Sequence, residues 1–333
     1  MMWKDSRIIN IVLERLVPLS CHPSEGIPIM HKSLFVAIGI PLLLFCRLGN
    51  AQPQGITMDM INTTLPLEGA APAVPGPYKV TSETTFGSPG HVLFRPADVR
   101  AFPAKDILPV LIWGNGGCAI DSTRYGGFLS TIASHGFLVL ATAAVKGEAQ
   151  RQATAQDLLS AINWAEAENR RKGSPLNGKI DTSRIAVMGQ SCGGMLSIRL
   201  GADPRVDTIG VFNAGAQPGN PNAPGSQFPT IEALPLLHGP VLLINGHERD
   251  FMMKTSAANF ALINHVPVFY GARHNAGHTA TVFHPGGGEY ANVAANWLLY
   301  FFKGDKEAGK MFVGKNCRLC TNPDWDTNSK KLK

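Results

Sequence analysis

The sequence has little charge, few aromatic residues and no apolar run as long as a membrane-spanning helix requires. Charged residues make up 16% of the chain and aromatic residues 8%, whereas 44% of the residues are hydrophobic. This balance predicts a globular chain with a sizeable core, and it argues against a disordered chain or a bundle of membrane helices. The net charge is +6, but Lys and Arg form no run interleaved with aromatic residues. We therefore expect no nucleic-acid partner.

The first 51 residues predict a leader followed by a signal peptide. A short positive segment, Met30-His31-Lys32, precedes a mostly apolar run over Leu34–Cys46. Gly49-Asn50-Ala51 then matches a small-x-small cleavage site, which predicts translation from Met30 and a mature chain that begins at Gln52. Because the apolar run is short for a bilayer span, we expect no stable membrane anchor, with an uncleaved anchor as the alternative. The predicted location is secreted or periplasmic.

From Lys79 onward, short β-rich segments alternate with helical patterns. The middle β-rich segments are nearly continuous apolar runs, which is typical of parallel strands covered on both faces. One predicted helix begins at Thr154-x-x-Asp157, a capping-box pattern, and another covers Gly288–Phe302. The alternation predicts an α/β protein with one doubly wound, mostly parallel sheet and helices on both faces. The predicted strands are His91–Phe94, Pro109–Trp113, Phe137–Ala141, Arg184–Met188, Thr208–Phe212, Val241–Ile244 and Val266–Tyr270.

Three further segments lack these patterns. Residues 52–78 are rich in Pro, Ala and Gly and predict an irregular N-terminal segment. Residues 214–230 are rich in Gly, Pro and Asn and predict a loop. The Lys-rich C-terminal end, with Lys330, Lys331 and Lys333, predicts a solvated tail.

The segment Gly189-Gln190-Ser191-Cys192-Gly193 is a G-x-S-x-G motif. It directly follows the predicted strand Arg184–Met188 and opens a helical segment over Gly194–Leu200. In such a strand–turn–helix setting, the flanking glycines permit a very tight turn that lifts the serine Oγ to the carboxyl edge of the sheet. Ser191 is therefore the predicted nucleophile, and a serine in an ordinary tight turn is the alternative.

A serine hydroxyl needs a base that accepts its proton and an acid that orients the base. With this motif, the acid and then the histidine follow in loops after later strands. The loop after Val241–Ile244 offers Glu248 and Asp250. We predict Asp250 because it lies farther along the loop, where a turn can aim it at the histidine, and Glu248 remains the alternative.

The loop after Val266–Tyr270 offers His274 and His278. We predict His278 as the base because it follows Gly277 and stands just ahead of the closing helical region. His247, His274 and His284 are expected at the surface or in structural hydrogen bonds. The two histidines four residues apart do not make a zinc-binding helix, because Gly277 interrupts them and the expected Glu is missing. We predict no metal and no organic cofactor.

Hydrolysis through a tetrahedral intermediate also needs two backbone N–H donors for the oxyanion. By position Cys192 supplies the first, since it follows the nucleophile. The second donor is expected in Trp113-Gly114-Asn115-Gly116-Gly117-Cys118, whose glycines let the backbone fold close to a substrate. A plain glycine turn is the alternative for this segment.

Two segments resemble a known family. Asp181–Gly194, which reads DTSRIAVMGQSCGG, and Ala133–Leu140, which reads ASHGFLVL, are similar to the dienelactone-hydrolase and cutinase-type polyesterase branch of the α/β-hydrolases. That branch includes the bacterial PET hydrolases, and the likeness covers about Tyr78–Lys303. It implies one α/β-hydrolase catalytic domain over residues 79–333, which would end in a Cys-x-x-Cys extension. It also supports Asp250 as the acid, through Gly246-His-Glu-Arg-Asp250.

The resemblance places Cys118 at the second oxyanion position, where this branch often has a tyrosine. A second departure is Asn213-Ala214-Gly215, which contains no tryptophan that could complete an aromatic clamp. Both departures argue against activity on aromatic polyesters and leave ester chemistry intact.

Four cysteines remain after the predicted cleavage, and an even number in an oxidising compartment predicts two disulfides. Because both predicted oxyanion residues are cysteines, and an oxyanion hole brings their backbones together, we predict a Cys118–Cys192 disulfide. Cys317 and Cys320 would form the second disulfide, since one Cys-x-x-Cys supplies too few ligands for a zinc site. Buried free thiols at positions 118 and 192 are the alternative.

The combined prediction is an exported serine hydrolase that cleaves carboxylic esters, in small molecules or polymers, through an acyl-enzyme. The expected walls of the site, Gly114–Asp121, residues 214–230 and Phe251-Met252-Met253, contain no Lys or Arg. We therefore expect neutral esters with short to medium acyl chains. The alternatives are an acyltransferase with the same triad, a long-chain lipase or polyesterase, a peptidase, and an inactive binding protein.

Overall fold

A computed structural model describes residues 67–145, 147, 149–219 and 227–333. The predicted leader, signal peptide and cleavage site lie outside the described residues, as do residues 220–226 of the predicted loop. The residues from Leu67 to Lys79 contain no helix or strand, which agrees with the irregular segment predicted there. Among the described residues, none of the helices combines the length and apolar character needed to cross a membrane.

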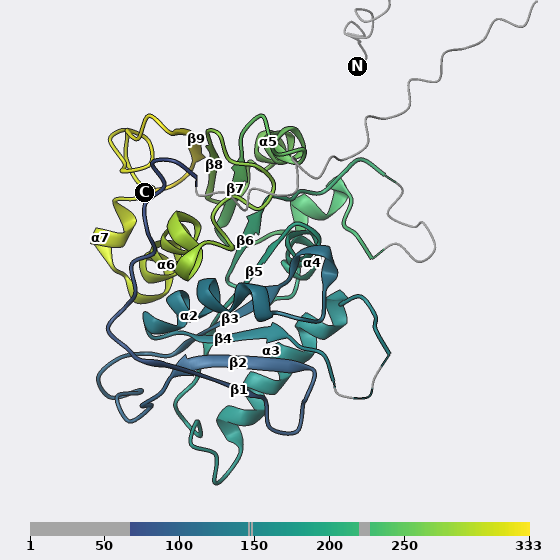
Figure 1. The fold of residues 1–333 in the computed structure, drawn as a ribbon, viewed down its shortest axis with the longest axis vertical. Helices are drawn as coiled ribbons and strands as arrows, with labels where there is room; N and C mark the ends of the chain where they lie inside the picture. The colour runs from purple at the N-terminus through teal and green to yellow at the C-terminus, as the bar shows by residue number, and fades with distance from the viewer. Residues whose placement is uncertain (1–66, 146, 148, 220–226) are drawn as a thin grey trace, which may run out of the picture. The chain divides into compact units, whose positions relative to one another are not determined.

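One sheet organises the described residues, with the strand order β1-β2-β4-β3-β5-β6-β7-β8-β9. Neighbouring strands from β4 to β8 are parallel, whereas β1, β2 and β9 pair antiparallel at the two ends of the sheet. Figure 1 shows β1 and β2 in blue at one end and β9 in yellow at the other. The strands are β1 Val80–Thr84, β2 His91–Pro96, β3 Pro109–Gly114, β4 Leu138–Thr142, β5 Asp181–Gln190, β6 Thr208–Phe212, β7 Val241–Gly246, β8 Val268–Arg273 and β9 Trp325–Lys330.

Helices cover both faces of this sheet, as the apolar strands require. All residues of β3, β4, β6 and β7 are buried. Along β3, Val110 and Ile112 join one hydrophobic cluster and Leu111 and Trp113 the other, because alternate side chains point to opposite faces. On the first face lie α3 Ala155–Arg170, α4 Cys192–Leu200 and α5 Met253–Leu262, and on the second lie α2 Gly126–Ser134 and α6 Gly288–Lys303 (Figure 1).

The short elements complete the connections between strands and helices. The α7 helix, Lys306–Gly309, packs against α6. Short 3-10 helices cover Gly116–Cys118, Thr123–Tyr125, Ile231–Leu236 and Pro285–Gly287. The capping box predicted at the start of α3 is present, since the Asp157 carboxylate accepts from the backbone N–H of Thr154 at 2.7 Å.

The doubly wound, mostly parallel sheet predicted from the sequence is confirmed, and each of the seven predicted strands overlaps an observed one. The sequence patterns do not predict the strands β1 and β9 or the helices α2, α5 and α7. Both added strands are short and largely exposed, so that their residues carry no apolar alternation.

The prediction that the Lys-rich end is a solvated tail is wrong for Lys330. This residue ends β9 and lies opposite Val268 of β8. Its Nζ donates to the carbonyl oxygens of Phe260 at 2.6 Å and Ala261 at 3.1 Å, in the last turn of α5. A cation stabilises the carbonyl end of a helix, and the backbone hydrogen bonds between β9 and β8 hold the strand in place. Neither interaction leaves a pattern in the sequence of β9.

Trp325 offers a test of this corrected C-terminus. Its side chain is buried in the cluster that also holds Tyr290 and Phe269. We expect Trp325→Ala to lower the free energy of unfolding by about 3–5 kcal/mol, as for other buried tryptophans. Urea unfolding followed by circular dichroism measures the change, and Lys333→Ala, at the exposed last residue, is the matched control. Equal stabilities of the two variants would support the prediction that the C-terminal end is a solvated tail.

Candidate active site

The predicted site residues gather at the carboxyl edge of the parallel strands. Cys118 follows β3, Ser191 follows β5, Asp250 follows β7 and His278 follows β8. Parallel strands present their carboxyl ends at one edge of a sheet, so loops after neighbouring strands meet there. The order of strands therefore brings together residues that are up to 160 positions apart in the chain.

Ser191 occupies a strained turn between β5 and α4. Its φ is +53° and its ψ is −121°, a conformation that residues with a side chain rarely adopt. The turn requires the flanking glycines: a Cβ on Gly189 would lie 2.4 Å from the carbonyl carbon of Gly193, and a Cβ on Gly193 would lie 2.0 Å from the oxygen of Gly114. The G-x-S-x-G spacing thus permits the backbone of α4 to touch the ends of β3 and β5.

Ser191, His278 and Asp250 form a continuous hydrogen-bonded chain. The Oγ of Ser191 lies 2.7 Å from Nε2 of His278, and Nδ1 of His278 lies 2.9 Å from Oδ1 of Asp250. Asp250 and His278 are both buried. This is the arrangement in which an imidazole can take a proton from the serine while the carboxylate holds the ring in one tautomer.

The carboxylate of Asp250 is held from several sides. Besides the imidazole, Oδ1 accepts from the backbone N–H of Met252 at 3.0 Å. The other oxygen, Oδ2, accepts from the side-chain amide of Asn213 at 2.8 Å and from the backbone N–H of Gly246 at 3.1 Å. The side chain of Asp250 is fully buried, and these donors leave its carboxylate little freedom to rotate away from His278. Asn213 had been noted in the sequence only for the lack of a nearby tryptophan.

The alternative candidates lie elsewhere. Glu248 has an exposed side chain and contacts the imidazole of His247, not that of His278. His274 places its Nε2 3.0 Å from Asp326 of β9. The structure therefore brings Asp250 and His278 to Ser191 and directs Glu248 and His274 to a separate group of side chains.

An aromatic ring covers one face of the imidazole. Phe251 stacks on His278 with ring centroids 4.0 Å apart and an angle of 28° between the planes. Stacking restricts the ring to the plane that points Nε2 at Ser191, and it shields the imidazole from water on that side. The sequence had indicated Phe251 as part of the wall of the site.

Gln190, inside the motif, connects the histidine loop to the segment after β3. Its Nε2 donates to the backbone oxygen of His278 at 2.8 Å, and its Oε1 accepts from the hydroxyl of Tyr125 at 3.0 Å. That hydroxyl in turn accepts from the backbone N–H of Gly116 at 2.8 Å. Burial raises the pKa of Tyr125 to about 12, so the phenol keeps the proton that it donates. Sequence reasoning missed Gln190 and Tyr125, because only the folded chain shows which loops their polar atoms reach.

A disulfide joins the two predicted oxyanion residues. Cys118 and Cys192 are bonded, and their Cα atoms lie 5.1 Å apart. Cys192 is the first residue of α4, where backbone N–H groups have no acceptor within the helix. The N–H of Gly116 is engaged by Tyr125, and the oxygen of Cys118 accepts from Ala153 at 2.7 Å, which holds this segment in place. The second disulfide joins Cys317 and Cys320. Both predicted disulfides are thus present in the structure.

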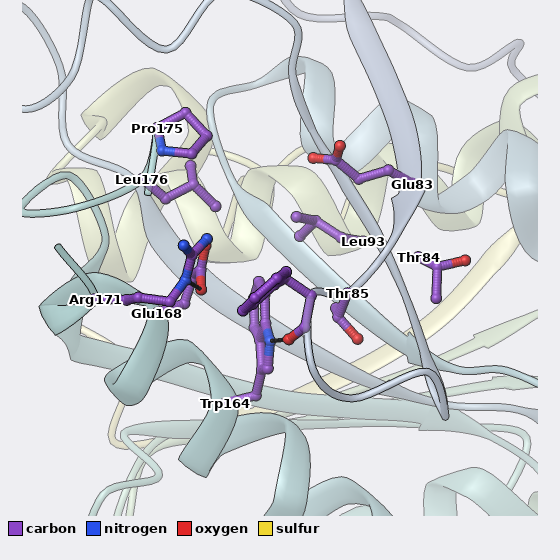
Figure 2. Close-up of a pocket in the computed structure, with 10 residues that line it drawn as sticks. Glu83, Thr84, Thr85, Leu93, Trp164, Glu168, Arg171, Pro175 and Leu176 are labelled. Atoms are coloured by element: carbon purple, nitrogen blue, oxygen red, sulfur yellow. Dashed lines mark hydrogen bonds and ion pairs between the residues drawn. The ribbon is translucent and has the colours of Figure 1, made fainter. Parts of the chain in front are cut away.

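A pocket of about 160 Å³ lies apart from these residues, between β1, β2 and α3. Figure 2 shows Glu168 and Arg171 side by side at its wall, where they form hydrogen bonds of 2.7 Å. The guanidinium of Arg171 also lies over the ring of Phe86, and Nε1 of Trp164 donates to the backbone oxygen of Phe86. Because these polar groups bond one another, we assign no function to this pocket.

The geometry around the acid predicts unequal effects of two substitutions. Asp250→Asn should slow phosphonylation of Ser191 by a fluorophosphonate about 10³- to 10⁴-fold, because an amide cannot hold the imidazole in the required tautomer. Glu248→Gln should change the rate little, since Glu248 contacts His247. The rate of fluorophosphonate labelling, followed by mass spectrometry, compares them. A larger loss of labelling rate in Glu248→Gln would identify Glu248 as the acid.

Removal of each disulfide should lower the stability by a different amount. The Cys118–Cys192 bond closes a loop with a sequence separation of 74, and the Cys317–Cys320 bond one of 3. Chain entropy then predicts that Cys118→Ser/Cys192→Ser lowers the free energy of unfolding by about 4 kcal/mol. Cys317→Ser/Cys320→Ser is the matched control, with a smaller expected loss.

Peptide mapping without reductant should find Cys118 linked to Cys192 in exported protein. Free thiols at both positions, or equal stability losses in the two double variants, would contradict the assignment of the first disulfide.

Comparison with known proteins agrees with this geometry. The PET hydrolase-like family matches residues 66–317. A cutinase of Thermobifida fusca is 30% identical over 181 residues, which are 53% of this chain and 57% of that protein. Cutinase 1 of Thermobifida cellulosilytica is 30% identical over 140 residues, 40% of this chain and 50% of that protein.

The chain thus spans about half the length of the curated relatives that it matches. The family match covers most of the chain, including the strands and loops that carry Ser191, Asp250 and His278. The resemblance drawn from the segments around Ser191 and His135 is confirmed, and this chain belongs to the PET hydrolase-like family of the α/β-hydrolase fold.

Proposed function

We propose that this protein is a serine hydrolase that cleaves carboxylic esters, with Ser191 as nucleophile, His278 as base and Asp250 as the acid that orients it. The observation that carries the proposal is the hydrogen-bonded chain from Ser191 through His278 to Asp250, at the turn between β5 and α4. The names of the relatives, which are cutinases, support ester hydrolysis as the reaction class.

The first half of the reaction forms an acyl-enzyme. The Oγ of Ser191 attacks the ester carbonyl carbon while Nε2 of His278 takes the hydroxyl proton. Negative charge then develops on the former carbonyl oxygen, and the backbone N–H groups of Cys118 and Cys192 would stabilise it. Collapse of this intermediate breaks the bond to the alcohol oxygen, which receives the proton from His278.

The second half releases the acid. Water replaces the alcohol and attacks the acyl carbon while His278 takes a proton from it. The new tetrahedral intermediate uses the same two N–H donors. It collapses by breaking the bond to Oγ of Ser191, which receives the proton from His278, so that the carboxylic acid and free Ser191 result. Asp250 stabilises the imidazolium in both halves through its bond to Nδ1, and Phe251 keeps the ring in plane.

The segments that follow β3 and β7 indicate a neutral substrate. Gly114–Asp121 and Phe251-Met252-Met253 contain no Lys or Arg that could bind a carboxylate or phosphate. Small and apolar side chains favour neutral esters, and we propose short to medium acyl chains, in small molecules or in a polymer. Two disulfides also favour an oxidising compartment, and we propose that the protein acts outside the cytoplasm.

Hydrolysis of p-nitrophenyl esters of graded acyl length tests the reaction and the substrate class together. We expect the highest kcat/KM at short to medium chains and no marked increase when the substrate forms an interface. Ser191→Ala should lose several orders of magnitude in kcat while it keeps the melting temperature of the unchanged protein.

Other outcomes separate the alternatives. An optimum at long chains with strong interfacial activation would identify a lipase. Ester formation with an added alcohol, in preference to hydrolysis, would identify an acyltransferase. Full activity of Ser191→Ala would contradict the proposed nucleophile.

A further inference from the structure

A buried bridge of two side chains joins the loop that carries His278 to the segment that follows β3. Gln190 is the residue before the predicted nucleophile, and Tyr125 ends a short 3-10 helix. The hydroxyl of Tyr125 accepts from the backbone N–H of Gly116 at 2.8 Å and donates to Oε1 of Gln190 at 3.0 Å. Nε2 of Gln190 then donates to the backbone oxygen of His278 at 2.8 Å. We call Tyr125 and Gln190 the Tyr–Gln bridge.

We propose that the Tyr–Gln bridge positions the reacting groups: Tyr125 acts through Gln190 to hold the loop of His278 and the segment of Cys118 in one fixed arrangement. The proposal rests on the proposed ester hydrolysis, because that reaction needs the base and the oxyanion donors around one carbonyl group at the same time. A link between the two loops would supply this arrangement before a substrate binds. Tyr125 and Gln190 are therefore positioning residues, and they take no part in the bonds that form or break.

The chemistry of the groups in the bridge gives each hydrogen bond a single direction. Burial raises the pKa of Tyr125 to about 12, against the opposing effects of the Gly116 N–H and the Arg124 charge, so the phenol keeps its proton at neutral pH. The N–H of Gly116 can only donate, and the backbone oxygen of His278 can only accept. Gln190 must therefore turn Oε1 to the phenol and Nε2 to the histidine loop. With the amide reversed, Oε1 and the oxygen of His278 would face each other as two acceptors.

Close packing keeps the bridge in place. Tyr125 is 4% exposed and Gln190 is 2% exposed. A Cβ on Gly116 would lie 2.1 Å from Oε1 of Gln190 and 2.6 Å from the hydroxyl oxygen of Tyr125, so position 116 requires glycine. The ring of Tyr125 also contacts Phe283, with ring centroids 5.0 Å apart, and Phe283 lies five residues beyond His278 in the same loop. Tyr125 thus meets the histidine loop twice, through a hydrogen bond carried by Gln190 and through an aromatic contact.

The bridge also restricts the choice of oxyanion donors. Because the N–H of Gly116 is engaged by the phenol, it is not available to a substrate oxygen, and the proposed donor remains the N–H of Cys118. Loss of the phenol hydroxyl would leave the N–H of Gly116 and Oε1 of Gln190 without their partners in a buried setting. Buried polar groups without partners are costly, so either segment would shift toward new partners. Such a shift would displace the donors or the base from the geometry of the transition state.

Tyr125→Phe tests the bridge because it keeps the packed ring and removes only the hydroxyl. With a p-nitrophenyl ester as substrate, we expect kcat to fall about 10- to 100-fold, the effect of buried polar groups left unpaired. KM should stay nearly unchanged, since the bridge acts on the geometry of the transition state and not on substrate binding. Tyr300→Phe is the matched control: it removes a hydroxyl in α6 that donates to the backbone oxygen of Lys333, and it should keep kcat.

A double variant tests whether Tyr125 acts through Gln190. Gln190→Met keeps the approximate size of the side chain without its amide, and we expect it to lower kcat by at least as much as Tyr125→Phe. The variant with both changes should lose little more than Gln190→Met alone, because residues in one hydrogen-bond chain have non-additive effects. Gln190→Met alone applies the same test of kcat and KM should Tyr125→Phe fail to fold.

Proton NMR gives a readout that needs no turnover. The Nδ1–H of His278, bonded to Asp250 at 2.9 Å, should give a resonance far downfield, whose position depends on the alignment of the imidazole with the carboxylate. We expect this resonance to shift or broaden in Tyr125→Phe and to stay in place in Tyr300→Phe. If the unchanged protein hydrolyses no ester, the proposed function fails, and this resonance still decides whether the bridge positions His278.

A loss of kcat without a change of KM in Tyr125→Phe, a shifted His278 resonance and non-additive losses would support the proposal. A folded Tyr125→Phe with unchanged kcat, an unmoved resonance, or a double variant whose losses multiply would overturn it.

Discussion

The close approach of α4 to the ends of β3 and β5 is the constraint on which the candidate site depends. A Cβ on Gly193 would lie 2.0 Å from the carbonyl oxygen of Gly114, so the contact exists only because both residues are glycines. At this contact Ser191 has a positive φ, and the start of α4 lies beside the segment after β3. The Cys118–Cys192 disulfide then joins two backbones that the glycines have already brought together. One packing contact thus accounts for the positions of Ser191 and of the Cys118–Cys192 pair.

The rest of the site is held by hydrogen bonds between loops, each of which begins at a rigid strand. Asn213, after β6, bonds to Asp250, and Gln190, after β5, bonds to the backbone of His278. Tyr125 extends the second connection to Gly116 after β3. The loops after β3, β5, β6, β7 and β8 are therefore each hydrogen-bonded to another loop of this group. Preorganisation of this kind lowers the reorganisation that the transition state would require.

The sequence was sufficient for those features that depend on local pattern. Apolar runs predicted the parallel strands, and glycine spacing predicted the turn at Ser191, because each of these features leaves its pattern within a single short segment of the sequence. The strand β9 could not be predicted, since Lys330 is placed by carbonyl groups of α5 and by pairing with β8. The roles of Asn213, Gln190 and Tyr125 could not be predicted for the same reason, because their hydrogen-bond partners are distant in the sequence. The choice of Asp250 over Glu248 rested on loop position and on family resemblance. In the structure the carboxylate of Asp250 contacts the imidazole of His278, and that of Glu248 contacts His247.

Identification of the residue that carries the acyl group during turnover tests the central claim most directly. The protein would be mixed with a p-nitrophenyl ester, quenched in acid within the first turnovers, digested and sequenced by tandem mass spectrometry. The account predicts the acyl mass on Ser191, with none on the neighbouring Cys192, whose sulfur is bonded to Cys118. An acyl group on Cys192 or on any other residue, or steady hydrolysis without an acylated residue, would contradict it.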